Sequence, residues 1–214
     1  GGWPDSNCLD GKSQSPIALS VAEASKTTFE PFSLVGYEKA FDVNVMNNGH
    51  TVVLTLSSGE APRIRGGGLD QDYVLQEMHF HWGSEHTIED KRYALEAHLV
   101  HYKEEYKNVM EPLKHDDGIA VLGVMFDLSP DDYDEFEKLV PIVPTLQSKL
   151  NQPANISSLI LRKFLPTDLE GFYRYNGSLT TPQCNEVVVW TVFTNVIEIS
   201  ERQVKIFQGM HTED

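Results

Sequence analysis

Two histidines separated by one residue, His79 and His81, stand in a run where polar and apolar residues alternate. Alternate side chains of a β-strand point to the same side, so Glu77, His79 and His81 are expected to share one face. The apolar residues between them would pack into a core and hold both imidazoles rigidly. Rigid imidazoles on one face are typical ligands of a transition-metal ion such as Zn²⁺.

A third histidine, His98, lies in the next segment with strand-like alternation. There Glu96, His98 and Val100 are predicted to share a face, whereas His101 points the other way and is interpreted as structural. Three neutral imidazoles would leave one tetrahedral position of Zn²⁺ open, which is the arrangement of a catalytic zinc site. Glu77 and Glu96 are placed to accept hydrogen bonds from the outer ring nitrogens of the ligands.

The spacing His79-x-His81-x-x-x-Glu85 also matches the metal motif of cupin barrels, in which Glu85 would bind manganese or iron. Cupins usually carry glycines on both flanks of that motif. This chain has Tyr73 and Arg92 at those two positions, so the cupin interpretation is disfavoured.

The surrounding sequence predicts a mainly β fold with few helices. Period-two alternation and β-branched residues mark strands at 43–45, 51–56, 74–82, 93–100, 119–126 and 187–196. A helix is expected from Ser129, as N-cap, to Val140, and a second short helix from Ser200 to Phe207. No repeat or linker divides the chain, so residues 1–214 are expected to form one domain.

The composition limits the possible partners. Seventeen Lys and Arg against 32 Asp and Glu give a formal charge of −15, which argues against nucleic acid as a partner. The apolar stretches are shorter than the ~18 residues of a membrane span, so no transmembrane segment is expected. The two cysteines, Cys8 and Cys184, are equally compatible with one disulfide and with two free thiols.

Taken together, these motifs resemble the α-class carbonic anhydrases nearly from end to end. The matching segments are Gln14-Ser15-Pro16-Ile17, Asn48-Gly49-His50, His79-Phe80-His81-Trp82-Gly83, Ser84-Glu85-His86-Thr87, Glu96-x-His98-Leu99-Val100-His101, Ala120-Val121-Leu122-Gly123 and Gly177-Ser178-Leu179-Thr180-Thr181-Pro182. The resemblance implies a large, twisted, mostly antiparallel sheet with a few short surface helices, which some schemes class as α/β. It also implies a lyase, carbonate dehydratase, that hydrates carbon dioxide reversibly to bicarbonate and a proton.

By resemblance, His79, His81 and His98 bind zinc, and zinc-bound hydroxide attacks carbon dioxide. Glu85 is then no ligand but accepts a hydrogen bond from Thr180, which orients the hydroxide. His50 matches the family's proton shuttle, because histidine as a residue type titrates near neutral pH. The implied substrate pocket consists of Val100, Val121, Leu179, Thr181, Val188 and Trp190. Sulfonamides and anions are the expected inhibitors.

The resemblance also decides between the two cysteine interpretations. Secreted and membrane-anchored members of the family pair cysteines at the positions of Cys8 and Cys184, which implies a disulfide and an extracellular location, secreted or anchored at the cell surface. Of two sequons, Asn155-Ile156-Ser157 is expected to carry a glycan. Asn176-Gly177-Ser178 is not, because it adjoins the active-site loop.

Some positions depart from the family pattern. Glu77 stands where the family usually has glutamine, the loop between Trp82 and Glu85 is short, and both ends lack family segments, which we interpret as omitted sequence. A catalytically silent binding or matrix domain is the alternative function. The presence of all three histidines, with Glu85 and Thr180, favours an active enzyme.

Overall fold

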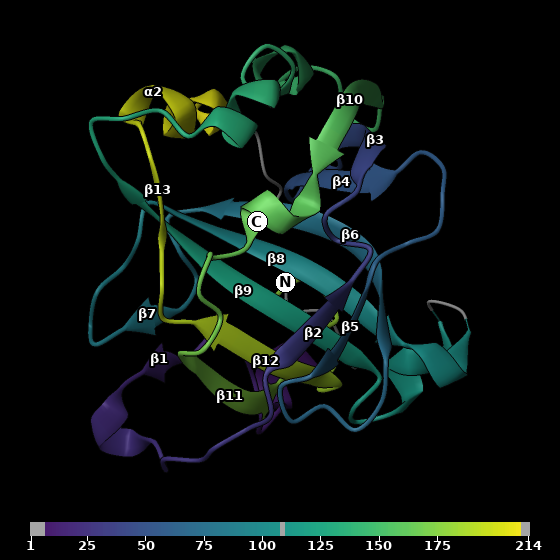
Figure 1. Ribbon diagram of the computed structural model, residues 1–214, viewed down its shortest axis with the longest axis vertical. Coiled ribbons are helices and arrows are strands. Elements are labelled where there is room, and N and C mark those ends of the chain that lie inside the picture. The colour runs from purple at the N-terminus through teal and green to yellow at the C-terminus, as the bar shows by residue number, and fades with distance from the viewer. Residues whose placement is uncertain (1–6, 108–109, 211–214) are drawn as a thin grey trace.

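The structure is a computed structural model that describes residues 7–107 and 110–210 (Figure 1). Its strands are β1 (Ala18–Leu19), β2 (Phe32–Val35), β3 (Ala40–Asn47), β4 (Val52–Leu56), β5 (Arg63–Gly66), β6 (Tyr73–Trp82), β7 (Thr87–Ile88), β8 (Leu95–Lys103), β9 (Ile119–Leu128), β10 (Ala154–Ile160), β11 (Phe172–Gly177), β12 (Val188–Phe193) and β13 (Ile197–Ile199). The α-helices are α1 (Asn7–Asp10) and α2 (Glu201–Val204). The 3₁₀ helices are η1 (Val21–Glu23), η2 (Glu104–Tyr106), η3 (Glu111–Lys114), η4 (Asp134–Lys138), η5 (Val143–Leu146), η6 (Leu161–Phe164) and η7 (Lys205–Phe207). The prediction of a mainly β fold with short helices is confirmed.

One 11-stranded sheet dominates the molecule, and its main path runs β10-β3-β4-β6-β8-β9-β12-β11. Most neighbours are antiparallel, but β12 and β13 both pair in parallel with β9. In Figure 1 the twisted sheet crosses the molecule with β8 and β9 in its middle, while β10 and β11 lie at opposite ends. Strands β6 and β8, which carry the three histidines, are therefore central and held on both sides.

The two faces of the sheet bury different sets of side chains. The larger cluster packs aromatic rings from the sheet against the short helices, among them Phe80, Phe136 and Phe207. His101 also lies on this side, where Nδ1 is 3.2 Å from the carbonyl oxygen of Ala120 and Nε2 contacts the hydroxyl of Tyr37. The predicted opposite orientations of His98 and His101 are confirmed.

The helix predicted from Ser129 to Val140 is wrong in extent and type. The segment forms only the 3₁₀ helix η4, and Tyr133 before it is extended, with φ −100° and ψ 119°. The side-chain amide of Gln203 bonds both the N–H and the carbonyl of Tyr133, at 2.8 and 2.9 Å. These bonds hold the segment against α2, so the backbone before η4 stays extended despite favourable capping residues.

The second predicted helix is confirmed as α2 followed by η7. Ser200 caps it, because its hydroxyl accepts the N–H of Gln203 while the Gln203 side chain accepts the N–H of Ser200. Within the part of the chain that the structure describes, no helix is long and apolar enough to cross a membrane.

A disulfide joins Cys8 in α1 to Cys184, and the two Cα atoms are 5.0 Å apart. The pairing agrees with the one implied by the family resemblance. It fastens the first described helix to the loop that follows Thr180, and this loop borders the cluster of histidines.

Candidate metal centre and cavity

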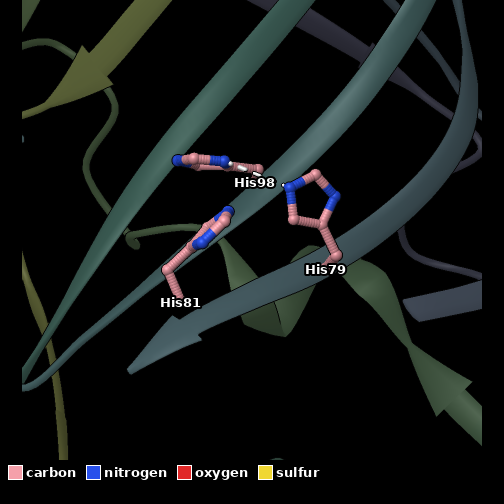
Figure 2. A group of neighbouring side chains, drawn as sticks. All are labelled: His79, His81 and His98. Carbon is pink, nitrogen blue, oxygen red and sulfur yellow. Dashed lines mark hydrogen bonds between the residues drawn. The ribbon is translucent and has the colours of Figure 1, made fainter. Parts of the chain in front are cut away.

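His79 and His81 extend from the same side of β6, and His98 extends toward them from β8 (Figure 2). His79 and His98 are directly opposite in the antiparallel register of the two strands. The ring centroids are 4.7 to 5.1 Å apart, and one nitrogen of each ring lies within 4.8 Å of the others. Strand alternation thus brings together the three histidines that the sequence singled out.

Carboxylates hold the outer nitrogens of two of these rings. Nδ1 of His79 lies 3.1 Å from Glu77, and Nε2 of His98 bonds to Glu96. A carboxylate accepts only, so each of these ring nitrogens carries the proton and the opposite nitrogen presents a lone pair. Nε2 of His79 and Nδ1 of His98 consequently face each other at 3.3 Å. Two lone pairs at this distance repel each other unless a cation lies between them.

His81 contributes a third nitrogen without a hydrogen bond. Its Nε2 is buried and has no hydrogen-bond partner among residues 7–107 and 110–210. Glu85 Oε1 is 3.3 Å away but is not in hydrogen-bonding geometry. Burial, followed by the neighbouring His98 and His79 rings, lowers the pKa of His81 to about 2. The ring is therefore neutral, which is the form of imidazole that coordinates a metal.

The donor set fits Zn²⁺. Three convergent imidazole nitrogens, with carboxylates behind two of them, match the ligand type and number of catalytic zinc sites. Burial opposes the ionisation of Glu96, but its contacts with His98 and His86 outweigh burial and hold its pKa well below the usual range. Glu96 is thus a carboxylate that can keep the proton of His98 on its outer nitrogen.

Thr180 and Glu85 meet beside the three rings. The hydroxyl of Thr180 donates to Oε1 of Glu85 at 2.7 Å, although the two residues are 95 positions apart. The proton of that hydroxyl is used in this bond, so the Thr180 oxygen can only accept from any other group near it. This contact is the one implied by the family resemblance.

A cavity of about 480 Å³ opens in front of His79 and His98, whereas His81 is not in its lining. Its lining residues are Asn48, His50, Thr51, Glu77, His79, His98, Val100, Val121, Leu179, Thr180, Thr181, Pro182 and Trp190. Five of the six predicted pocket residues are therefore in the lining. The sixth, Val188, is fully buried behind it in the cluster that contains Val100, Val121 and Trp190.

His50 lies at the cavity with an exposed side chain. It belongs to the turn between β3 and β4, where its backbone N–H donates to Oδ1 of Asn48 at 2.9 Å. Sequence reasoning placed His50 here by resemblance but assigned nothing to Asn48 or Thr51, which line the same wall.

Sequence reasoning also missed a buried series of hydrogen-bonded side chains behind His98. Oε2 of Glu96 is 2.8 Å from Nδ1 of His86, whose Nε2 is 2.6 Å from the hydroxyl of Tyr175. That hydroxyl bonds to Ser15 at 2.8 Å. Only the segment Ser84–Thr87, already quoted for Glu85, could have pointed to His86. These hydrogen bonds connect Glu96, behind the histidine cluster, to Ser15 in the N-terminal part of the fold.

Comparison with known proteins agrees with this geometry. The model of the eukaryotic-type carbonic anhydrase family matches residues 2–214. Mouse carbonic anhydrase 15 is 36% identical over 94% of this chain and 66% of its own length. Mouse carbonic anhydrase 4 is 36% identical with the same two coverages, and human carbonic anhydrase 6 is 32% identical over 94% of this chain and 68% of its own length.

The chain thus spans about two thirds of the length of these relatives. The family match covers β6 and β8, which carry the three histidines, and the loop that carries Thr180. The match and the folded arrangement of these residues lead to one assignment: the chain belongs to the eukaryotic-type carbonic anhydrase family.

Proposed function

We propose that the protein is a zinc enzyme that converts carbon dioxide reversibly to bicarbonate and a proton. The observation that carries the proposal is the convergence of three imidazole nitrogens, together with the Thr180–Glu85 hydrogen bond, at a cavity lined by His79, His98 and Thr180. His79, His81 and His98 would hold the metal. Zinc, when bound, supplies a hydroxide nucleophile at neutral pH by acidifying water.

Thr180 sets the direction of attack. Because its hydroxyl donates to Glu85, its oxygen accepts the proton of the nucleophilic hydroxide and leaves a lone pair free to face the substrate carbon. A preorganised bond of this kind needs no rearrangement during the reaction. The apolar wall of Val100, Val121 and Leu179 offers a linear, uncharged molecule a place beside that lone pair.

His50 would carry the product proton away. Its side chain is exposed and lines the same cavity as His79 and His98, and histidine is the residue type that exchanges protons near neutral pH. Glu77 and Glu96 keep the outer protons on His79 and His98, which fixes the ligand tautomers. Primary sulfonamides and small anions would compete for the open metal position.

We further propose an extracellular location, secreted or anchored at the cell surface, with a role in bicarbonate and pH regulation. The Cys8–Cys184 disulfide supports this, because such bonds persist in oxidising compartments. Asn155 is the proposed glycosylation site. It is exposed in β10, an end strand of the sheet, and is not among the residues that line the cavity.

Stopped-flow measurement of CO₂ hydration, combined with metal analysis of the purified protein, tests the proposal. We expect stoichiometric zinc and a hydration rate that falls when a chelator removes the metal. The matched control is His115→Ala, which removes a histidine stacked on Tyr106 outside the cavity. A protein that binds no zinc and hydrates no CO₂ would overturn the enzyme and favour a silent binding domain.

A further inference from the structure

The sequence contains two Asn-Gly dipeptides, Asn48-Gly49 and Asn176-Gly177. Glycine has no Cβ to hinder attack by its own backbone nitrogen on the preceding asparagine side chain, so such dipeptides are chemically the most exposed to loss of ammonia. The fold gives the two copies different surroundings. The difference between these surroundings points to Asn48, at the cavity, as a modification site.

The Asn48 side chain is folded over the Gly49 peptide. Its Oδ1 accepts backbone N–H groups from His50 and from Thr51, each at 2.9 Å. The bond from His50 closes a ring of atoms that contains the Gly49 nitrogen, so the side-chain carbonyl carbon and that nitrogen are held in one small turn. Gly49 has φ +88°, a conformation that suits glycine.

The same two N–H groups polarise the Asn48 carbonyl and would stabilise negative charge on Oδ1 as a nucleophile adds to its carbon. One contact opposes the reaction, since the Gly49 N–H donates to Oδ1 of Asn47 at 3.0 Å. Breaking one such bond costs about 1 kcal/mol net, less than a tenfold change in rate. The turn therefore favours addition more than it hinders it.

We propose that Asn48 is a site of spontaneous deamidation in the folded protein. The Gly49 nitrogen attacks Cγ of Asn48 and loses its proton, the side-chain nitrogen leaves as ammonia, and a five-membered succinimide forms. Water then opens the ring at either carbonyl, which yields an α-linked aspartate or a β-linked isoaspartate. No oxidant, reductant or cofactor is required.

Asn176-Gly177 is the internal control. Both residues lie in β11 and pair with Val189 and Val188 of β12, which holds the backbone extended. A Cβ on Gly177 would approach Oγ of Ser15 to 2.1 Å. Gly177 is thus packed against Ser15, and the extended, paired backbone turns the exposed Asn176 side chain away from the Gly177 nitrogen.

The position of Asn48 gives the modification a consequence. Asn48 and His50 both line the cavity. Deamidation would add a carboxylate there, and the β-linked product would also insert a methylene into the backbone two residues before His50. The modification itself does not depend on the proposed function, because it needs neither metal nor substrate.

The test is an ageing experiment on the folded, disulfide-bonded protein at mildly alkaline pH. Timed samples are digested and analysed by mass spectrometry for both dipeptides, and isoaspartate is labelled with a protein isoaspartyl methyltransferase. We expect Asn48 to react roughly tenfold or more faster than Asn176 in the native state, with comparable rates once urea and reductant unfold the chain. The proposal is overturned if the ratio of the Asn48 rate to the Asn176 rate in native protein is smaller than this, or if the ratio is the same in native and unfolded protein.

The variant Asn48→Ser keeps a side-chain oxygen for the turn but has no amide to lose. It should abolish the signal from this peptide and leave the Asn176 rate unchanged. Persistence of the signal in that variant would show that another residue reacts. Because the readout is mass, a failure here is separate from a failure to find CO₂ hydration.

Discussion

At the residue scale, the proposed metal site depends on protons held on the far sides of two histidine rings. Nε2 of His79 and Nδ1 of His98 face each other 3.3 Å apart only because Glu77 and Glu96 retain the protons on the far sides of the rings. A cation bound between the two nitrogens would relieve the repulsion of their lone pairs. His79 with Glu77, and His98 with Glu96, would therefore each act as one unit in holding the metal.

Replacing a ligand should affect metal and activity together. His98→Ala leaves two imidazoles, which are too few for tight Zn²⁺ binding, so zinc content and CO₂ hydration should both fall by orders of magnitude. Elemental analysis and stopped-flow kinetics measure the two quantities, with His115→Ala as the matched control. Full zinc occupancy with normal turnover in His98→Ala would refute the ligand assignment.

Removing the proposed proton carrier should have a different signature. His50→Ala leaves the ligands intact, so zinc content should stay unchanged while turnover slows in dilute buffer. Added imidazole should restore part of the rate, because it can accept the proton from the cavity. An equal loss at every buffer concentration would instead indicate structural damage.

At the element scale, the predictable parts of the fold are the strands whose hydrophobic pattern matches their burial in the sheet. Strands β6, β8 and β9 were predicted because their alternation or long apolar runs match burial in a central sheet. Strands β10 and β11 were missed, since Asn, Ser, Arg and Tyr interrupt any period-two pattern in these end strands. The helix expected at Ser129 failed because Gln203, 70 positions from Tyr133, determines that segment's backbone.

The candidate site likewise has a part that the sequence pattern predicts and a part that it does not. The shared face of His79 and His81 follows from strand geometry alone. The Thr180–Glu85 contact spans 95 positions and involves a loop, and spacing in the sequence carries no distance of that kind. Only the family resemblance supplied it, as it supplied the pairing of Cys8 with Cys184.

At the element scale, the disulfide leads to a prediction about the stability of the protein. It joins residues 176 positions apart, so chain-entropy reasoning gives it at most roughly 5 kcal/mol. Reduction should lower the melting temperature of the native protein, while the Cys8→Ser/Cys184→Ser double variant should melt lower and not respond to reductant. Two alkylatable thiols in native protein from its source would contradict both the bond and the extracellular location.

At the scale of the whole molecule, the sheet separates the cavity of the histidine cluster from a core that contains the buried imidazole of His101. His101 is fully buried on the core side, and burial lowers its pKa to about 4, although its bond to the Ala120 carbonyl opposes the shift. Nδ1 donates to that carbonyl and Nε2 accepts from Tyr37, so the neutral ring satisfies both partners. Protonation would leave the Tyr37 contact between two donors.

The pH dependence of stability follows from this shift. Between pH 6.5 and about 4 the unfolded chain binds a proton at His101 that the folded chain does not, so stability falls as the pH falls. The loss should reach about 3 kcal/mol across that window. Urea unfolding at several pH values measures the free energy of unfolding, which should change less steeply with pH for His101→Gln than for the native chain. NMR titration of the His101 ring checks the pKa directly. Equal slopes would contradict the assignment.

The covalent ring closed by Cys8 and Cys184 also determines how the molecule would bear a mechanical load. If the chain is pulled from its two ends, tension passes through the sulfur atoms. The segment between the cysteines then bears no load, and this segment contains all three histidines and Thr180. The part after Cys184 lies outside the ring and can extend, at most about 3.5 Å per residue. Strand β12, which brings Trp190 to the cavity, lies in that part together with β13 and α2, so it is free to peel from β9 and β11. Force would thus open the cavity wall while the histidine cluster remained folded inside the ring.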